Sequence, residues 1–147
     1  MIDHRQSRIL TKARRWIGTP WRAGQSKCGV STDCVGLVIG ICREMGWNNL
    51  KVDNYKQTPE GDSLVREFRS RLKEKNIEDR QPADILLFRL GQEQHPGHVG
   101  FLADNNRLIH ADQRKHIKKV VEIPIGYWEN RITHCFELDY PNSKNPQ

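Results

Sequence analysis

The sequence has 147 residues, which is enough for one domain that buries well over half of the surface of its unfolded chain. Hydrophobic residues make up 36% and charged residues 29%, and no apolar run approaches the roughly 20 residues that a bilayer-spanning helix needs. The net charge of +6 indicates an anionic partner or simply a well-solvated surface, because the basic residues are interrupted by acidic and apolar ones. We expect a single domain over residues 1–140, a flexible tail over 141–147 and no membrane insertion.

The first half of the chain carries helical patterns. They predict helices over 3–17, from 32 or 33 to 45, and over 62–75, with a long loop over 47–60. Asp3 and Asp33 are candidate N-caps of the first two helices, which Gly18 and Gly46 should end. The apolar faces are formed by Ile9, Leu10, Ala13, Trp16 and Ile17 in the first helix, Val35, Leu37, Val38, Ile41 and Met45 in the second, and Leu64, Val65, Phe68 and Leu72 in the third.

The sequence pattern of the second half of the chain predicts short strands. Ile85–Phe88, His98–Leu102 and Arg107–His110 are apolar runs, and Asp104–Asn106 supplies a hairpin turn between the second and the third. Two further strands are predicted over 117–123 and 133–138. Helices followed by an antiparallel sheet indicate an α+β fold in which the N-terminal helices pack on a central sheet.

The four cysteines do not indicate a metal site. No Cys-x-x-Cys pair occurs, and the six-residue spacing of Cys28 and Cys34 does not match a zinc knuckle. Met1–Arg5 lacks the apolar segment of a secretory signal, so we expect synthesis in the cytoplasm and free thiols. Cys42 lies in an apolar stretch and is expected in the core. We expect neither a metal nor a cofactor.

Cys34 is distinguished by its place in the first turn of a hydrophobic helix, directly after Asp33. There the helix dipole and the free backbone N–H groups should lower the pKa of the thiol, and the same N–H groups can donate to an oxyanion. Gly36 should leave space for a substrate beside the sulfur. A cysteine that is merely packed at a helix start remains the alternative on these residues alone.

Two histidines on neighbouring predicted strands can supply the base that a thiol nucleophile needs. His98 begins one strand and His110 ends the next, so the hairpin between them can place both imidazoles on one face of the sheet. One ring can then accept the thiol proton while the other orients it. His4, His95, His116 and His134 are expected to be solvated or hydrogen-bonded residues outside any site.

Five segments in order resemble motifs of the NlpC-type cell-wall cysteine peptidases. The resemblance runs from about residue 10 to residue 112, most of the chain. The segments are Gly18-Thr19-Pro20-Trp21, Asp33-Cys34-Val35-Gly36-Leu37-Val38, Ala83-Asp84-Ile85-Leu86-Leu87-Phe88, His98-Val99-Gly100-Phe101-Leu102 and Ile109-His110-Ala111.

The resemblance implies a papain-like fold with a Cys–His–His triad. Cys34 would be the nucleophile, His98 the general base and acid, and His110 the residue that orients it. Family substrates are peptidoglycan stem peptides, commonly cut between D-glutamate and a diamino acid. The apolar residue after the cysteine and the absence of a secretory signal resemble the phage-tail and gene-transfer-agent branch, which implies phage tail proteins as partners and the virion as a location.

The chain departs from the family pattern at two positions of the expected substrate and oxyanion region, which comprises Trp21, Asp33, Val35 and Gly36. Trp21 stands where the family usually has tyrosine. An indole N–H can donate a hydrogen bond, but it does not reproduce the geometry of the tyrosine hydroxyl. Val35 replaces the usual serine but keeps its backbone N–H.

Other functions remain open on the sequence. A papain-like amidase, transpeptidase or acyltransferase would use the same triad, because the cleft selects the acceptor. A non-catalytic tail or wall-binding module could keep the fold. A nucleic-acid binder is disfavoured, because no helix-turn-helix, zinc-finger or RNA-binding pattern occurs.

Overall fold

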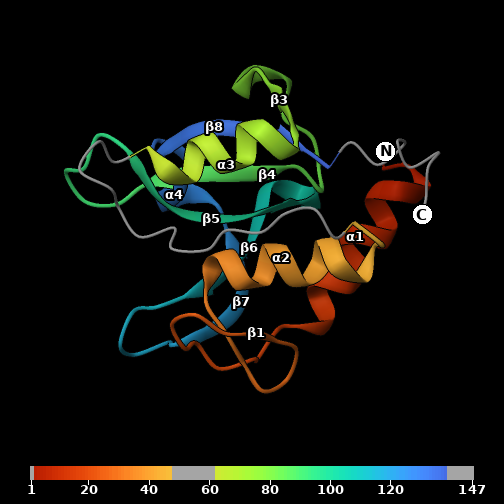
Figure 1. The fold of residues 1–147 in the computed structure, drawn as a ribbon, viewed down its shortest axis with the longest axis vertical. Coiled ribbons are helices and arrows are strands. Elements are labelled where there is room, and N and C mark those ends of the chain that lie inside the picture. The colour runs from red at the N-terminus through yellow and green to blue at the C-terminus, as the bar shows by residue number, and fades with distance from the viewer. Residues whose placement is uncertain (1, 48–61, 139–147) are drawn as a thin grey trace.

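The structure, a computed structural model, describes residues 2–47 and 62–138. It has the predicted α+β architecture (Figure 1). The predicted loop over 47–60 lies almost wholly outside the described residues, and the predicted tail over 141–147 lies wholly outside them. The domain boundary at residue 140 therefore stays a prediction.

The first helix, α1, spans His4–Arg15 and begins as predicted at Asp3. The Asp3 side chain accepts a hydrogen bond from the backbone N–H of Gln6 (2.8 Å), and the Gln6 side chain accepts one from the Asp3 N–H (2.8 Å). This reciprocal capping satisfies two amides that the first turn of a helix leaves free. The helix ends earlier than predicted, and Ile17, expected on its apolar face, is 45% exposed.

The second helix, α2, spans Cys34–Glu44 and carries most of the buried helical surface. Asp33 is its N-cap, as predicted, and accepts a hydrogen bond from the Gly36 N–H at 2.7 Å. After the helix ends, Gly46 adopts a φ of 85°, a left-handed conformation that glycine reaches without steric cost.

The main sheet has six antiparallel strands in the order β3-β8-β4-β5-β6-β7. The predicted turn joins β5 to β6, and Asn105 and Asn106 take positive φ there. A small hairpin of β1 and β2 precedes α2. The strands are β1 Ser26–Lys27, β2 Ser31–Thr32, β3 Lys73–Lys75, β4 Ile85–Arg89, β5 Pro96–Ala103, β6 Arg107–Asp112, β7 Lys119–Pro124 and β8 Ile132–Glu137.

The prediction of one helix over 62–75 is wrong at its C-terminal end. The helix, α3, spans Ser63–Arg71, and the backbone becomes extended at Leu72 (φ −125°, ψ 168°). Residues Lys73–Lys75 then form β3, which pairs with β8 at the edge of the sheet. Pairing with a neighbouring strand thus overrides the helical pattern.

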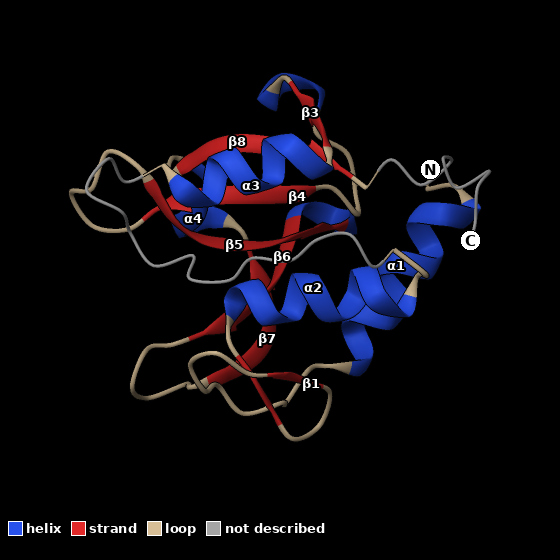
Figure 2. Cartoon of the chain, viewed as in Figure 1, coloured by secondary structure: helices blue, strands red, loops and turns tan. Residues whose placement is uncertain are grey.

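The strands alternate their side chains between two hydrophobic clusters, one on each face of the sheet. The larger cluster contains the buried residues of α1, α2 and α3 together with every second residue of the strands. The smaller one is closed by the short helix α4, Gly126–Glu129, which the sequence did not predict. Figure 2 shows α3 across β8, β4 and β5, with α2 beside the segment where β6 and β7 turn away.

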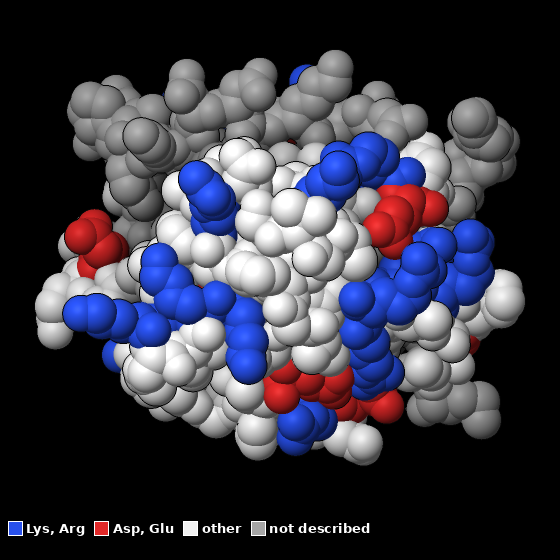
Figure 3. All heavy atoms as spheres, turned by 90° about the horizontal axis from the view of Figure 1, so that it is seen from below, with Lys and Arg blue, Asp and Glu red and all other residues white. Residues whose placement is uncertain are grey.

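No helix within the described residues is both long and apolar enough to span a bilayer. On the face drawn in Figure 3, lysine and arginine side chains form separate groups with acidic side chains between them. The charge of +6 is therefore not gathered into one continuous patch on that face.

Candidate active site

Cys34 occupies the first turn of α2 and is held there by its neighbour Asp33. One carboxylate oxygen of Asp33 accepts from the Gly36 N–H, and the other accepts from the Gly24 N–H, each at 2.7 Å. Asp33 therefore joins the start of the helix to the preceding loop, and both residues are buried. The cysteine is 8% exposed and belongs to the larger hydrophobic cluster.

The free thiol does not have the lowered pKa that its helix position predicted. Burial raises the pKa of Cys34 to about 12, and the negative charge of Asp33 adds to this. The backbone N–H groups of Val99, Val35 and Cys34 itself act in the opposite direction without outweighing the desolvation. The sulfur is consequently a neutral thiol at neutral pH and needs a base before it can attack.

His98 and His110 form a direct pair, as the hairpin between their strands predicted. His98 Nε2 and His110 Nδ1 lie 2.7 Å apart, and the two rings meet edge to face at 81°. One nitrogen of this pair must donate and the other accept. Because β5 and β6 are hydrogen-bonded neighbours, the sheet itself fixes the spacing of the rings.

Both imidazoles are buried and neutral. Burial is the largest cause that lowers the pKa of His98 to about 3, and the nearby His110 adds to it. Burial likewise lowers the pKa of His110 to about 4. A neutral imidazole is the form that can accept a proton from a thiol.

The Trp128 side chain of α4 packs against this histidine pair. Its ring stacks on His98 with centroids 4.8 Å apart and an interplanar angle of 27°, and it meets His110 edge-on at 5.6 Å. No periodic pattern in the sequence predicts this residue, because α4 is only four residues long. The adjacent aromatic residues Tyr127 and Trp128 were its only signal.

The backbone of β5 links the cysteine to the histidine pair. The amide that faces the Cys34 sulfur belongs to Val99, the residue directly after His98. Among the hydrogen bonds of residues 2–47 and 62–138, none joins the sulfur to an imidazole. The structure thus brings the two histidines into contact and places the cysteine against the strand that carries the first of them.

The remaining residues of the expected substrate and oxyanion region have defined packing roles. Trp21 is half-buried against the core, and the Lys118 ammonium lies 4.7 Å above its ring. Val35 is buried in the core beside Cys34.

The space expected for a substrate at Gly36 is filled by protein. A Cβ atom on Gly36 would collide with the carbonyl oxygen of Gln25 and with side-chain oxygens of Thr32 and Asp33. The glycine is required by the close approach of the loop, so the prediction that it leaves room for a substrate is wrong on this side.

The other histidines and cysteines lie apart from this site. His4, His95 and His116 are exposed, and His134 is half-buried with Nδ1 2.9 Å from Thr133 Oγ1, as predicted. All four cysteines are free thiols, and Cys42 is buried in the core as expected. The described ranges contain no group of three or more His, Cys, Asp or Glu side chains that could hold a metal ion.

The structure adds Asp112 to the surroundings of the histidine pair, which the sequence analysis overlooked. Asp112 follows His110 by two residues on β6, so both side chains lie on the same face of the strand. The Asp112 carboxylate is 2% exposed, and its Oδ2 lies 3.7 Å from His110 Nε2. The i, i+2 spacing within a predicted strand was the signal that could have found it.

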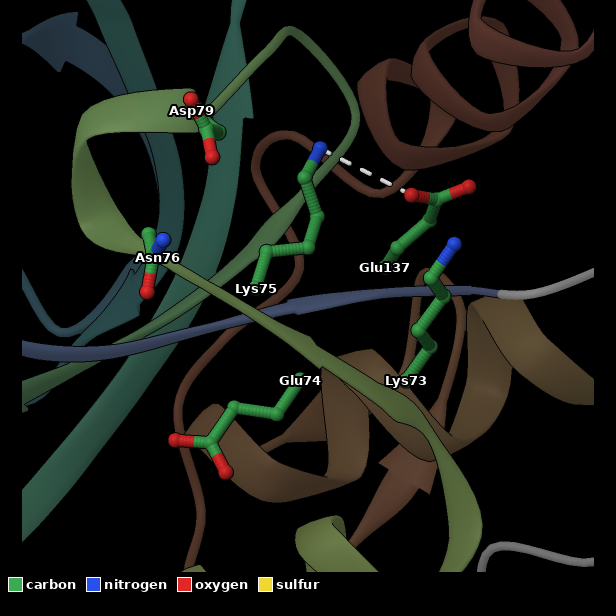
Figure 4. A pocket seen from close by; sticks show the side chains of 6 residues that line it. All are labelled: Lys73, Glu74, Lys75, Asn76, Asp79 and Glu137. Atoms are coloured by element: carbon green, nitrogen blue, oxygen red, sulfur yellow. Dashed lines mark ion pairs between the residues drawn. The ribbon is translucent and has the colours of Figure 1, made fainter.

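A hollow of about 580 Å³ lies at the opposite edge of the sheet, at β3 (Figure 4). Its lining includes Lys75 and Glu137, which form an ion pair at 3.7 Å, and Lys75 Nζ also lies 2.7 Å from Asp84 Oδ2. Strands β8 and β4 separate β3 from β5, the nearer of the two strands that carry the histidine pair, so this hollow is not part of the same site.

Comparisons with known proteins find matches over most of the chain. Residues 18–137 match the model of the NlpC/P60 family, a segment that includes Cys34, His98 and His110. The curated protein "Probable endopeptidase NlpC" of Escherichia coli K12 is 28% identical over 118 residues, which cover 80% of this chain and 68% of that protein.

Solved structures of the same kind share the fold. The NlpC/p60 domain of the peptidoglycan hydrolase SagA superposes with a TM-score of 0.65 at 16% identity, covering 90% of this chain and 97% of that one. NlpC1 from Trichomonas vaginalis gives a TM-score of 0.66 at 20% identity, covering 94% of this chain and 46% of that one. These similarities show a papain-like NlpC/P60 fold for the chain.

Proposed function

Because this chain belongs to the NlpC/P60 family, we propose that it is a cysteine peptidase that hydrolyses amide bonds in the stem peptides of peptidoglycan. Cys34 is the nucleophile in this proposal, His98 the general base and acid, and His110 the residue that orients His98. The observation that carries the proposal is the 2.7 Å contact between the imidazoles of His98 and His110, because His98 lies on the strand that also faces the cysteine.

The neutral state of all three groups sets the order of events. At neutral pH the thiol is protonated and the imidazoles are neutral. His98 therefore takes the proton from Cys34 as the sulfur attacks the amide carbonyl. Since His98 Nε2 is occupied by His110, the nitrogen that receives the proton is Nδ1. The imidazolium that results is stabilised by its contact with His110.

The second half of the reaction uses the same proton. His98 returns it to the leaving amine when the carbon–nitrogen bond breaks, which leaves an acyl group on the sulfur as a thioester. Water, deprotonated by His98, then hydrolyses the thioester and restores the thiol. The backbone N–H of Cys34 at the helix start is the donor available to the oxyanion.

Two finer statements extend the proposal. We propose that the bond cut lies between D-glutamate and a diamino acid, as the resemblance to the cell-wall peptidases implies. We also propose that the protein is carried on a phage tail, where it meets the wall during DNA entry, which Val35 in place of serine supports.

Product analysis tests the proposed reaction. Defined muropeptides are incubated with the protein, and the fragments are identified by mass spectrometry. The proposal predicts paired fragments that gain one water and end at D-glutamate and at the diamino acid. Fragments joined to an amine acceptor would instead show a transferase, and intact muropeptides that remain bound to the protein would show a binding module.

A separate measurement tests the location. If the protein is a tail component, mass spectrometry of purified phage particles should detect it. Its absence from intact particles would contradict the tail assignment and leave the peptidase chemistry unaffected.

A further inference from the structure

The second ring nitrogen of His110 has no hydrogen-bond partner among residues 2–47 and 62–138. His110 is fully buried, with 0% of its side chain exposed, and its Nε2 is an unsatisfied buried polar atom. An unpaired polar group in a protein interior is destabilising, so its position calls for an explanation. The nearest charged group is the carboxylate of Asp112, whose Oδ2 lies 3.7 Å away.

Asp112 is held by a fork of hydrogen bonds from Arg114. The guanidinium Nε lies 3.1 Å from each carboxylate oxygen, Nη2 lies 2.7 Å from Oδ2, and the Arg114 backbone N–H donates to Oδ1 at 2.9 Å. Burial raises the pKa of Asp112, but these hydrogen bonds outweigh it, so the pKa lies below its usual value. A fixed and ionised carboxylate therefore faces His110 at neutral pH.

The proton that is shared between His98 Nε2 and His110 Nδ1 can be bonded to either nitrogen. The two arrangements differ in whether His98 Nδ1 can act as a base. If His110 carries its proton on Nδ1, it donates to His98 Nε2, and the His98 proton must then lie on Nδ1, where it blocks the base. If His110 carries its proton on Nε2, its Nδ1 accepts from His98 Nε2–H, and His98 Nδ1 is bare. Only the second arrangement leaves a base for the Cys34 thiol.

We propose that Asp112, clamped by Arg114, is a positioning residue that draws the proton of His110 to Nε2 and thereby keeps Nδ1 of His98 bare. This inference rests on the proposed function, in which His98 is the base. The nitrogen and oxygen need to approach by about 0.8 Å to reach a hydrogen-bond distance of about 2.9 Å. A shift of that size lies within ordinary thermal displacement.

The surroundings of the pair contain few competing charges. His98 of β5 is neutral, Trp128 of α4 is uncharged, and Cys34 of α2 is a neutral thiol. The titratable groups of α4 are Tyr127, which interacts with Arg114, and Glu129, which pairs with Arg80 at 3.0 Å, and the residue opposite Asp112 on β7 is Lys119. Asp112 is thus the anion that can select the tautomer.

The informative substitution is Asp112→Asn, which has nearly the same shape. Arg114 should keep the amide oxygen of asparagine, so the amide NH₂ turns to His110 and donates to Nε2. That contact favours the arrangement in which His110 carries its proton on Nδ1. The proton of His98 should then lie on its own Nδ1. The expected result is a fall in kcat of about 10²-fold or more with KM changed little, as expected when the group that orients a catalytic histidine is lost.

A measurement that does not depend on activity reads the tautomers directly. Imidazole nitrogen NMR in a Cys34→Ala background should show His98 Nδ1 bare and Nε2 protonated with Asp112 present, and the reverse with Asp112→Asn. The matched control is Asp104→Asn, which also removes a carboxylate paired with an arginine, Arg14, but lies at the hairpin turn. It should leave both tautomers and kcat unchanged.

The outcomes separate the inference from the proposed function. If Cys34→Ala is inactive while Asp112→Asn has the tautomers and kcat of the wild type, the role of Asp112 is wrong and the peptidase assignment stands. If Cys34→Ala keeps full activity, the peptidase assignment fails, and the nitrogen spectra still decide the role of Asp112. Should Asp112→Asn fail to fold, Arg114→Gln offers the same test, with a smaller expected loss because the carboxylate remains.

Discussion

His98 Nε2 lies 2.7 Å from His110 Nδ1, and both rings are almost completely withdrawn from solvent. The contact is imposed by two adjacent strands and by the Trp128 ring stacked on His98. It follows that the proton distribution of His98 depends on His110. The geometry of the histidine pair is therefore set by the sheet.

Replacing His110 by phenylalanine should remove the acceptor while keeping a ring against Trp128. We expect kcat for muropeptide hydrolysis to fall about 10²–10⁴-fold, because His98 is no longer held with Nδ1 as the free base. Steady-state kinetics measures the effect, and His134→Phe, a half-buried histidine outside the pair, is the control. A His110→Phe variant within twofold of the wild type would contradict the orienting role.

The stability of the fold should decline in mild acid because both histidines are buried in their neutral form. Their pKa values are lowered to about 3 and about 4, against about 6.5 in an unfolded chain, so below pH 6.5 the unfolded state binds more protons. The contribution of the two histidines to the free energy of unfolding should be level above about pH 7. Between pH 6.5 and the folded pKa values it should fall by up to about 1.4 kcal/mol per pH unit for each histidine.

Urea unfolding between pH 8 and pH 5 measures this dependence. His110→Asn removes one of the two titrating groups and should reduce the slope by about half. A wild-type free energy of unfolding that stays constant down to pH 5 would show that the imidazoles are not held neutral.

Gly36→Ala should destabilise the protein, because its Cβ would meet the Gln25 carbonyl and the oxygens of Thr32 and Asp33. Overpacking of this kind costs about 1–3 kcal/mol. Gly126→Ala is the matched control, since nothing lies within 4 Å of the added carbon and its φ is not positive. Equal unfolding midpoints for the two variants would contradict the assigned packing of Gly36.

The parts of the fold that the sequence predicted are those in which local pattern and tertiary contact agree. Asp3 and Asp33 cap the helices that they were expected to begin, and the Asp104–Asn106 turn joins the expected strands. The apolar runs gave the central strands correctly, because a strand buried on both faces needs an unbroken apolar sequence.

The incorrect or missing predictions concern residues whose structure is determined by contacts with segments distant in the sequence. Lys73–Lys75 is a charged segment with no strand pattern of its own, and it becomes a strand only by pairing with β8. The thiol pKa of Cys34 was predicted from its helix, whereas burial under the whole fold sets its direction. Asp112 could not be placed beside His110 until the register of β6 was known.

The most direct test of the account is the rate of muropeptide hydrolysis by Cys34→Ala beside the wild type and Cys28→Ala. Cys28 is an exposed free thiol, so its removal controls for general effects of losing a cysteine. The account predicts that Cys34→Ala loses at least about 10³-fold in kcat/KM, as expected when a covalent nucleophile is removed, while Cys28→Ala keeps the wild-type value. Full activity of a folded Cys34→Ala would contradict it.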